Sequence, residues 1–246
     1  MKSLLAAIML FTRLPLWRVF KIDKTYYSNA LLYWPLVGFI TGAVTWGTLY
    51  LLSSVMPLVT ACILAISVRL LLTGALHEDG LADFFDGFGG GTDKSAILRI
   101  MKDSHIGSYG TIGLIVYFIL YISLLNYCGA SAGIIIGADV LSKLCTAIMI
   151  NTLPYARMEE ESKVKVLYRK VHWYEFLIVA IVCIAILWYI STPFLALVPV
   201  ILTIIGLRAY FKYKIGGYTG DCCGATVLLA EQTFYISAVI ITFCAL

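Results

Sequence analysis

Long apolar runs dominate this chain, and short polar segments separate them. A helix needs about 20 apolar residues to cross a bilayer. Seven runs of this kind can be marked, at 31–52, 56–76, 109–127, 130–151, 175–192, 193–211 and 225–245. Because several runs adjoin, we expect about six to eight transmembrane helices. The pattern predicts an all-α, polytopic membrane helix bundle that forms one integral-membrane catalytic domain over residues 1–246.

Basic residues gather in alternate segments between these runs, whereas 53–55, 128–129 and 191–193 carry no charge. The basic residues are Arg13, Arg18, Lys21, Lys24, Lys94, Arg99, Lys102, Arg157, Lys163, Lys165, Arg169, Lys170, Lys212 and Lys214. The positive-inside rule makes the charged segments and the N-terminus cytoplasmic, in a multi-pass protein of the cell (inner) membrane. Residues 1–20 lack a small-residue cleavage site, so we interpret them as an interfacial, amphipathic segment.

Composition supports the membrane prediction. Hydrophobic residues make up 61% of the chain and charged residues 13%, with a mean hydropathy of +0.93; a soluble domain has about 25% charged residues. The net charge of +4 reflects the basic loops, so no nucleic-acid partner is predicted. The seven cysteines form no C-x-x-C pair, which favours free thiols.

Four of the 14 acidic residues stand within the string HEDGLADFFDG at 77–87. On a helix, Asp79, Asp83 and Asp86 share one face at spacing i, i+4, i+7, and Glu78 lies about 100° from Asp79. Like charges repel, so a bound cation would explain the cluster, and carboxylate ligands favour Mg²⁺. We expect this segment at the C-terminal end of the second span, where the helix dipole also favours a cation. A solvated acidic helix end is the alternative.

A second polar segment, Lys102-Asp103-Ser104, precedes the third run. Lys102 is suited to hold a phosphate as a point charge. A membrane-interface anchor, with Asp103 or Ser104 as the N-cap of the next helix, explains the segment equally well.

A third polar segment, GGYTGDCCG at 216–224, precedes the last run. Glycines before a helix N-terminus let backbone N–H groups approach a phosphate, and Asp221 is a candidate metal ligand facing the acidic segment. The alternative is that Asp221 or Thr219 only caps the last helix.

Ionisable residues also fall within or beside the apolar runs. Asp139 and Lys143 have the i, i+4 spacing of an ion pair, and Glu231 lies on the last run. Intramembrane charges often mark a functional site, although an ion pair explains Asp139 and Lys143 equally well. Arg69 and Arg157 are candidate phosphate partners, with snorkelling as the alternative.

Carboxylates, glycine loops and basic residues on one side of a membrane together indicate Mg²⁺-assisted phosphoryl transfer. The sequence has no P-loop, G-x-S-x-G or H-E-x-x-H motif to support another reaction class. The residues alone do not identify the substrate.

Nearly the whole chain resembles the cobalamin synthase family. The matching pieces are, in order, FTRLP at 11–15, PLVG at 35–38, HEDGLAD at 77–83, DG at 86–87, MKDS at 101–104, PYAR at 154–157, GGYTGD at 216–221 and GA at 224–225. The string H-x-D-G-L-A-D-x-x-D-G is the most specific of them. One departure is His105, which stands where the resemblance leads us to expect an arginine, so a phosphate role there is in doubt.

The resemblance implies an enzyme that joins adenosylcobinamide-GDP to α-ribazole or its 5′-phosphate and releases GMP, with Mg²⁺ required. It implies that Asp79, Asp83 and Asp86 hold the metal, with Glu78 as a further candidate ligand. Asp83 or Asp221 would accept the hydroxyl proton, and this choice stays open.

The same resemblance makes Arg13, Lys102, Asp103 and Arg157 candidates for substrate or phosphate binding. The implied partners are these substrates and the lipid bilayer, and the oligomeric state stays open. A CDP-alcohol phosphotransferase is an alternative, but its D-G-x-x-A-R start and downstream aspartates are missing. A cation transporter is a further alternative, although transport sites usually lie near the bilayer midplane.

Overall fold

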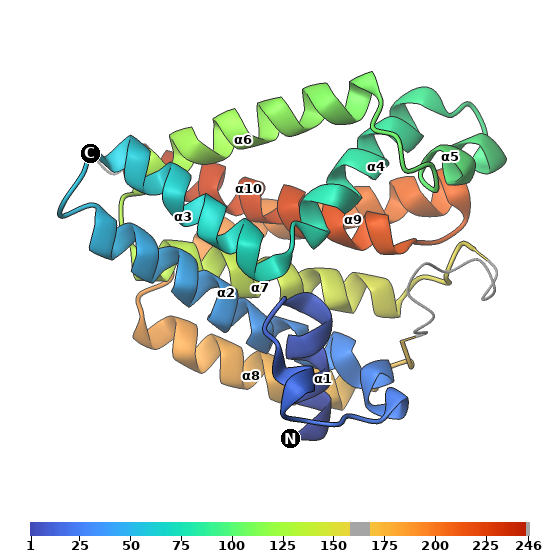
Figure 1. Ribbon diagram of the computed structural model, residues 1–246, viewed down its shortest axis with the longest axis horizontal. Coiled ribbons are helices and arrows are strands. Elements are labelled where there is room, and N and C mark those ends of the chain that lie inside the picture. The colour runs from blue at the N-terminus through green and yellow to red at the C-terminus, as the bar shows by residue number, and fades with distance from the viewer. Residues whose placement is uncertain (158–167, 245–246) are drawn as a thin grey trace.

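The computed structural model is an all-helical bundle, and it describes residues 1–157 and 168–244 (Figure 1). The helices are α1 (Lys2–Phe11), α2 (Ala30–Leu52), α3 (Leu58–Thr73), α4 (Leu76–Gly90), α5 (Lys94–Ile100), α6 (Ser108–Cys128), α7 (Ala132–Asn151), α8 (Trp173–Tyr189), α9 (Leu197–Ile215) and α10 (Gly220–Cys244). Short 3₁₀ turns occupy Leu16–Arg18, Lys24–Asn29 and Phe194–Ala196. Within the described ranges there is no β-strand, only an isolated bridge between Tyr155 and Tyr218. The predicted fold class is confirmed.

Each of the seven predicted apolar runs contains a helix. Five helices, α2, α6, α7, α9 and α10, are long and apolar enough to cross a membrane, and a sixth span results if the bent pair α3 and α4 counts as one. Helix α8 is apolar but shorter, at 17 residues. The structure thus reaches the lower end of the predicted count. Lys163 and Lys165, which helped to define a cytoplasmic loop, lie outside the described residues.

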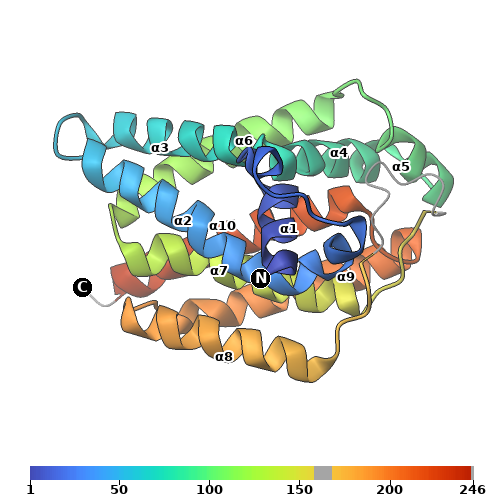
Figure 2. The same ribbon diagram turned by 60° about the horizontal axis from the view of Figure 1, so that its bottom comes forward.

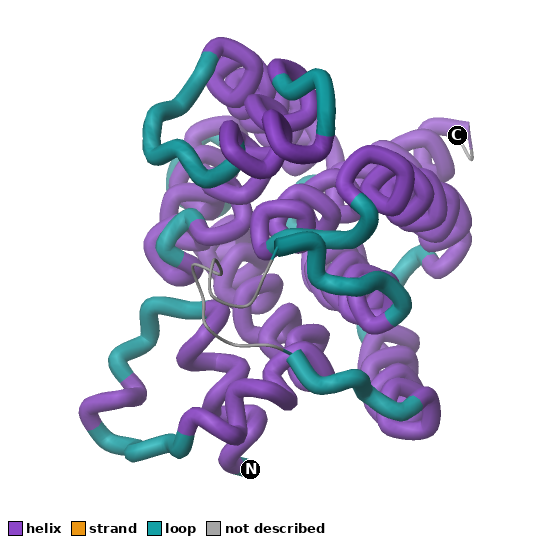
Figure 3. The backbone as a smooth tube through the Cα atoms, turned by 90° about the vertical axis from the view of Figure 1, so that its right-hand side faces the viewer, coloured by secondary structure: helices purple, strands orange, loops and turns teal. Residues whose placement is uncertain are grey.

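Helix α7 is the centre of the bundle. It is buried along most of its length and packs against α2 and α10, whereas α6 and α9 present apolar side chains outward. Figure 3 shows the bundle nearly end-on, with the loops gathered at its near end. An outward apolar surface is what lipid-facing helices require.

Two elements depart from simple up-and-down packing. Helix α1 crosses α2 instead of running along the bundle (Figures 1 and 2). Helices α3 and α4 meet at a bend of 92°. The crossing and the bend lie beside each other, and the main cavity forms at this junction.

Candidate active site

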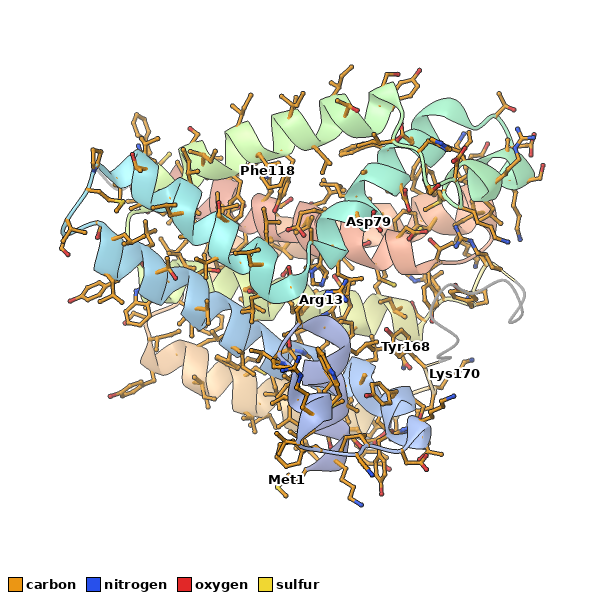
Figure 4. The ribbon with its side chains drawn as sticks, viewed as in Figure 1. Met1, Arg13, Asp79, Phe118, Tyr168 and Lys170 are labelled. Carbon is orange, nitrogen blue, oxygen red and sulfur yellow. The ribbon has the colours of Figure 1, made fainter. Side chains whose placement is uncertain are left out.

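A cavity of about 280 Å³ lies between α1, α2, α4 and the start of α10. Four of the predicted site residues line it: Arg13, Asp79, Arg157 and Asp221. Figure 4 labels Arg13 and Asp79, which come from separate segments, at this junction. The volume is near the lower limit of small-ligand sites, so the cavity can enclose one part of a larger ligand. The fold thus joins two arginines and two carboxylates from distant parts of the sequence.

Close packing of α4 on α10 brings Asp79 and Asp221 into the same cavity. A Cβ atom added to Gly80 would lie 3.0 Å from the backbone oxygen of Asp221, and one added to Gly224 would lie 2.9 Å from the backbone oxygen of His77. The two helices therefore approach almost backbone to backbone, which a larger side chain at either glycine would prevent.

The start of α10 positions Asp221. The hydroxyl of Thr219 accepts a hydrogen bond from the Cys222 N–H at 3.2 Å, so Thr219 caps the helix as one of the alternatives predicted. Asp221 follows in the first turn, and its carboxylate lies 3.3 Å from an Nη atom of Arg157. Thr219 therefore takes the capping role, and the Asp221 carboxylate lines the cavity beside a cation.

Backbone pairing between two loops holds Arg157 in place. The N–H of Ala156 donates to the Tyr218 carbonyl at 2.9 Å, and the N–H of Tyr218 donates to the Pro154 carbonyl at 3.0 Å. The Tyr155 and Tyr218 rings meet edge to face at 5.4 Å. Burial raises the pKa of Tyr218, so its hydroxyl stays neutral. Two motif pieces far apart in sequence, 154–157 and 216–221, thus form one structural unit.

Arg13 reaches the cavity because the chain bends between α3 and α4. Gly74 and Ala75 adopt left-handed conformations, with φ of 68° and 54°, which interrupts the helix. The Arg13 N–H donates to the Leu72 carbonyl at 2.7 Å, and its side chain packs over Gly74, where a Cβ atom would collide with it. A side chain at position 74 would therefore displace Arg13.

The same bend corrects the predicted environment of the acidic segment. We expected it at the C-terminal end of the second span, but that helix ends at Thr73, and Glu78 and Asp79 lie in the first turn of α4. The dipole of α4 therefore favours negative charge near Asp79, so the expected dipole contribution to cation binding was wrong.

Asp86 lies away from the cavity and serves the next transmembrane helix. Its carboxylate accepts hydrogen bonds from the N–H groups of Gly107 at 2.7 Å and Gly110 at 2.9 Å. It thus satisfies exposed N–H groups at the start of α6. The expectation that Asp103 or Ser104 would cap this helix was wrong, because α6 begins later, at Ser108.

Lys102 and Asp103 also lie outside the cavity lining. Both are exposed, in the loop that leads from α5 to the Asp86 contact. The Asp103 carboxylate accepts from the His105 N–H at 3.0 Å and contacts the His105 ring at 2.7 Å. These hydrogen bonds lower the pKa of Asp103. The structure therefore separates this loop from Arg13 and Arg157.

The other two acidic residues of α4 have different surroundings. Asp83 is partly buried, one turn beyond Asp79 on the same helical face. Glu78 is buried, at 6% exposure, and its Oε2 atom has no hydrogen-bond partner in the described ranges. It lies within electrostatic reach of Arg69, Glu231 and Lys143. Glu78 thus belongs to the bundle interior.

Two ion pairs occupy that interior. Lys143 pairs with Asp139 as the i, i+4 spacing predicted, and the Thr41 hydroxyl donates to the same carboxylate at 2.6 Å. Arg69 forms two hydrogen bonds with Glu231, at 2.5 and 2.6 Å. Arg69 is only 2% exposed, so both earlier interpretations, phosphate partner and snorkelling side chain, were wrong.

Sequence reasoning missed an aromatic part of the cavity wall. Phe11, Trp34, His77 and Tyr168 line the cavity together with the charged residues. On α4, His77 lies off the face that Asp79, Asp83 and Asp86 share. Phe11 and His77 begin the matched FTRLP and HEDGLAD pieces, and Trp34 directly precedes the PLVG piece, so the resemblance was the available signal for these three residues. These aromatic residues meet because separate helices cross at the cavity, and hydrophobic periodicity along one helix does not predict such crossings.

Comparisons with known proteins identify the family of this chain. The model of the family described as "Cobalamin-5-phosphate synthase" matches residues 3–239. The chain belongs to this family. Since the match covers nearly the whole chain, the predicted family and the prediction of a transferase are confirmed. The family match also favours a cobalamin synthase over a CDP-alcohol phosphotransferase or a cation transporter.

Named relatives extend the family match. The chain is 37% identical to the "Adenosylcobinamide-GDP ribazoletransferase" of Shewanella sp. (strain W3-18-1), over 96% of this chain and 93% of the relative. It is 34% identical to the protein of the same name from Leptospira interrogans, over 94% and 92% of the two chains. No solved structure matches the chain. The similarity thus covers more than nine tenths of each of these relatives.

Proposed function

We propose that this protein is an adenosylcobinamide-GDP ribazoletransferase that acts in cobalamin biosynthesis. It would join adenosylcobinamide-GDP to α-ribazole, or to α-ribazole 5′-phosphate, and release GMP. Family membership and the names of the relatives support this activity. The observation that carries the proposal is the meeting of Arg13, Arg157, Asp79 and Asp221 in one cavity, because cations and carboxylates together suit the transfer of a charged phosphoryl group.

The proposed reaction exchanges one bond to phosphorus for another. A ribazole hydroxyl attacks the phosphorus atom attached to the cobinamide arm and forms a phosphodiester. The bond from that phosphorus to the bridging oxygen breaks, and GMP leaves with the electron pair. The hydroxyl proton passes to a carboxylate, for which Asp83 and Asp221 are the candidates. Arg13 and Arg157 would bind phosphate oxygens.

Arg157 is well suited to an anionic ligand. Its side chain is 3% exposed, and its Nε atom has no acceptor among residues 1–157 and 168–244. A buried guanidinium N–H without an acceptor is unfavourable, and a phosphate oxygen would supply one. Asp221 would keep the guanidinium oriented while the substrate binds.

Mg²⁺ is the proposed cofactor, and the residues present fit it in a limited way. Asp79 and Asp221 offer carboxylates to the cavity, and Asp83 lies one turn away. No group of three His, Cys, Asp or Glu side chains is arranged to hold a metal in the described part of the chain. Mg²⁺ often uses one or two carboxylates together with substrate phosphates. The bound ion would neutralise charge on the phosphates and the departing GMP.

Glu78 and Asp86 remain predicted metal ligands, but their contacts favour other roles. Asp86 already accepts two backbone hydrogen bonds, and Glu78 is buried beside Arg69 and Lys143. Lys102 and Asp103 likewise remain predicted phosphate residues. We therefore propose Asp79, Asp83 and Asp221 as the core of the reaction site.

We further propose that the site faces the cytoplasm from a multi-pass protein of the inner membrane. The basic segments that the positive-inside rule assigns to the cytoplasm include Arg13 and Arg157, both of which line the cavity. A cytoplasmic opening would admit soluble nucleotide substrates directly.

The test is a defined assay with the full chain in lipid nanodiscs. Adenosylcobinamide-GDP, α-ribazole and Mg²⁺ should yield GMP and the cobamide product, detected by mass spectrometry. Replacing Mg²⁺ by excess EDTA should abolish product. Asp79→Asn and Asp83→Asn should lower turnover by about a hundredfold or more, whereas Asp93→Asn, at the exposed cap of α5, should not. No GMP from the wild type, while a relative is active alongside, would refute the proposal.

A further inference from the structure

Three aromatic side chains from three helices form a stacked column at the cavity. The ring centroids of Phe11 and Trp34 are 4.7 Å apart with planes at 12°, and those of Trp34 and His77 are 5.8 Å apart at 14°. All three line the cavity, and none is more than 4% exposed. The column therefore forms one wall of the site, supplied by α1, α2 and α4.

Two nitrogen atoms in this column lack hydrogen-bond partners. Neither Trp34 Nε1 nor His77 Nε2 has a partner in the described part of the protein, although both atoms are buried. The indole N–H is a donor only, so it requires an acceptor. Leaving such a buried group unsatisfied is unfavourable. Two unsatisfied atoms on adjacent rings of one cavity wall point to a ligand that completes them.

The packing limits how a ligand can meet this wall. Phe11 and His77 both stack on the Trp34 ring with nearly parallel planes, so ring faces are taken up by this stacking and the indole offers a ligand its edge. Apolar side chains, including Met9, Leu10 and Leu76, line the cavity as well. Burying an unpaired charge in such surroundings is unfavourable, and Arg13 and Arg157 are the better partners for phosphate.

We propose that the edge of this column, at Trp34 Nε1 and His77 Nε2, binds an uncharged amide-type group of the substrate. The carbonyl oxygen accepts from the Trp34 N–H. The amide N–H donates to His77 Nε2, or the carbonyl accepts from it, depending on the tautomer. A planar group with both an acceptor and a donor satisfies either case. The column thus recognises a part of the substrate that does not react.

Two parts of the proposed substrate carry this chemistry, so the identity of the group rests on the proposed function. One is the lactam edge of guanine in the GDP portion, and the other is a carboxamide side chain of the corrinoid. The two differ in size and can be supplied separately, as GMP and as cobinamide. Binding of each alone distinguishes them.

The experiment is equilibrium binding of GMP and of cobinamide to the full chain in nanodiscs. Trp34→Phe removes the indole N–H and keeps an aromatic ring, and His77→Phe removes Nε2. Each variant should lower the affinity for the same one of the two probes by about three- to tenfold, which is the effect of losing one neutral hydrogen bond. His77→Gln places an amide nitrogen near the Nε2 position and should restore binding to within about twofold of wild type.

A matched control comes from the same helix. Trp46 also lies on α2, but its indole N–H donates to the Ala130 carbonyl at 3.0 Å, and Trp46 is not a cavity-lining residue. Trp46→Phe should leave both probes bound as in the wild type. Melting temperatures of all variants separate local loss of binding from misfolding.

The outcomes show which part of the substrate binds at the edge, and they test the proposed function separately. Weakened GMP binding, with the same loss for IMP and none for AMP, assigns the edge to guanine; weakened cobinamide binding alone assigns it to a carboxamide. If wild type binds neither probe, or if Trp34→Phe and His77→Phe bind both normally, the inference is overturned. Wild-type turnover, measured in parallel, reports on the proposed function independently of this comparison.

Discussion

The protein holds charged residues in two different ways, in the bundle interior and around the cavity. In the interior, Arg69 and Glu231 form a two-pronged pair with both side chains 2% exposed, and the Arg69 guanidinium also donates to the Tyr121 hydroxyl at 2.6 Å. At the cavity, Arg157 and Asp221 approach only to 3.3 Å, with Asp221 12% exposed. The interior pair has short, well-aligned contacts, and the cavity pair does not.

This difference separates structural charges from functional ones. A buried pair gains little over apolar residues, but removing one partner leaves an uncompensated charge. The interior pair joins α3 to α10 and so fixes helices that carry the cavity residues. Within residues 1–157 and 168–244, Arg69 and Arg157 each keep an Nε atom without an acceptor, but only Arg157 lines the cavity, where a ligand can supply one. Variants in the first region should change stability, and variants in the second should change substrate binding.

The largest effect is expected from Glu231→Gln, which leaves the Arg69 charge buried without its counter-ion. We expect the free energy of unfolding to fall by about 3–5 kcal/mol, measured by thermal unfolding in detergent. The matched control is Glu175→Gln, since Glu175 also lies 2.5 Å from its partner, Arg169, but is partly exposed. That change should cost under about 1 kcal/mol. Equal losses in the two variants would contradict the distinction between buried and exposed pairs.

A smaller effect, on binding instead of stability, is expected from Arg157→Met. Loss of a charged hydrogen-bond donor in the cavity should raise KM for adenosylcobinamide-GDP by about ten- to a hundredfold, with the melting temperature nearly unchanged. Arg208→Met is the control, because Arg208 is partly exposed, its Nε donates to Thr152 at 2.8 Å, and it does not line the cavity. A drop in stability without a change in KM would show that Arg157 has a structural role, as the interior pairs do, and does not bind substrate.

Much of the fold follows from local sequence pattern. Each of the seven apolar runs contains a helix, and the i, i+4 spacing predicted the pair between Asp139 and Lys143. The bend between α3 and α4 did not follow, because hydropathy continues across it while two residues adopt positive φ. Only Gly74 hinted at a break, and a glycine in an apolar run is common in membrane helices.

Only part of the cavity lining was predictable from the sequence, and its arrangement was not. Arg13, Asp79, Arg157 and Asp221 were selected in advance and share the cavity. Helical spacing placed Asp86 on the same face as Asp79, but spacing does not show which neighbouring helix packs against each turn of α4. Two turns along α4 that neighbour is α6, whose N–H groups engage Asp86. Pairings between distant segments, such as Arg69 with Glu231, leave no periodic signal.

Asp86→Asn tests whether Asp86 has a structural role, like the interior pairs, or a functional role as a metal ligand. The amide keeps one acceptor oxygen for the two N–H groups of Gly107 and Gly110, so stability should fall by about 1–2 kcal/mol. Thermal unfolding measures that loss. Turnover and its Mg²⁺ dependence are measured on the same samples, because a metal ligand would require higher Mg²⁺ for half-maximal rate. An unchanged melting temperature with such a shift would assign Asp86 to the metal.

The smallest effect is expected at the bend that carries Arg13. Gly74→Ala adds a Cβ atom where the Arg13 side chain lies, in a backbone with φ of 68°. Arg13 keeps its charge and can adopt another rotamer, so KM should rise only about threefold, with a modest loss of stability. Ala75→Gly relieves the neighbouring left-handed residue, at φ 54°, without adding an atom near Arg13. It should raise stability by about 0.5–1 kcal/mol and leave KM unchanged. If both variants shift KM equally, backbone flexibility at the bend, and not the position of Arg13, controls binding there.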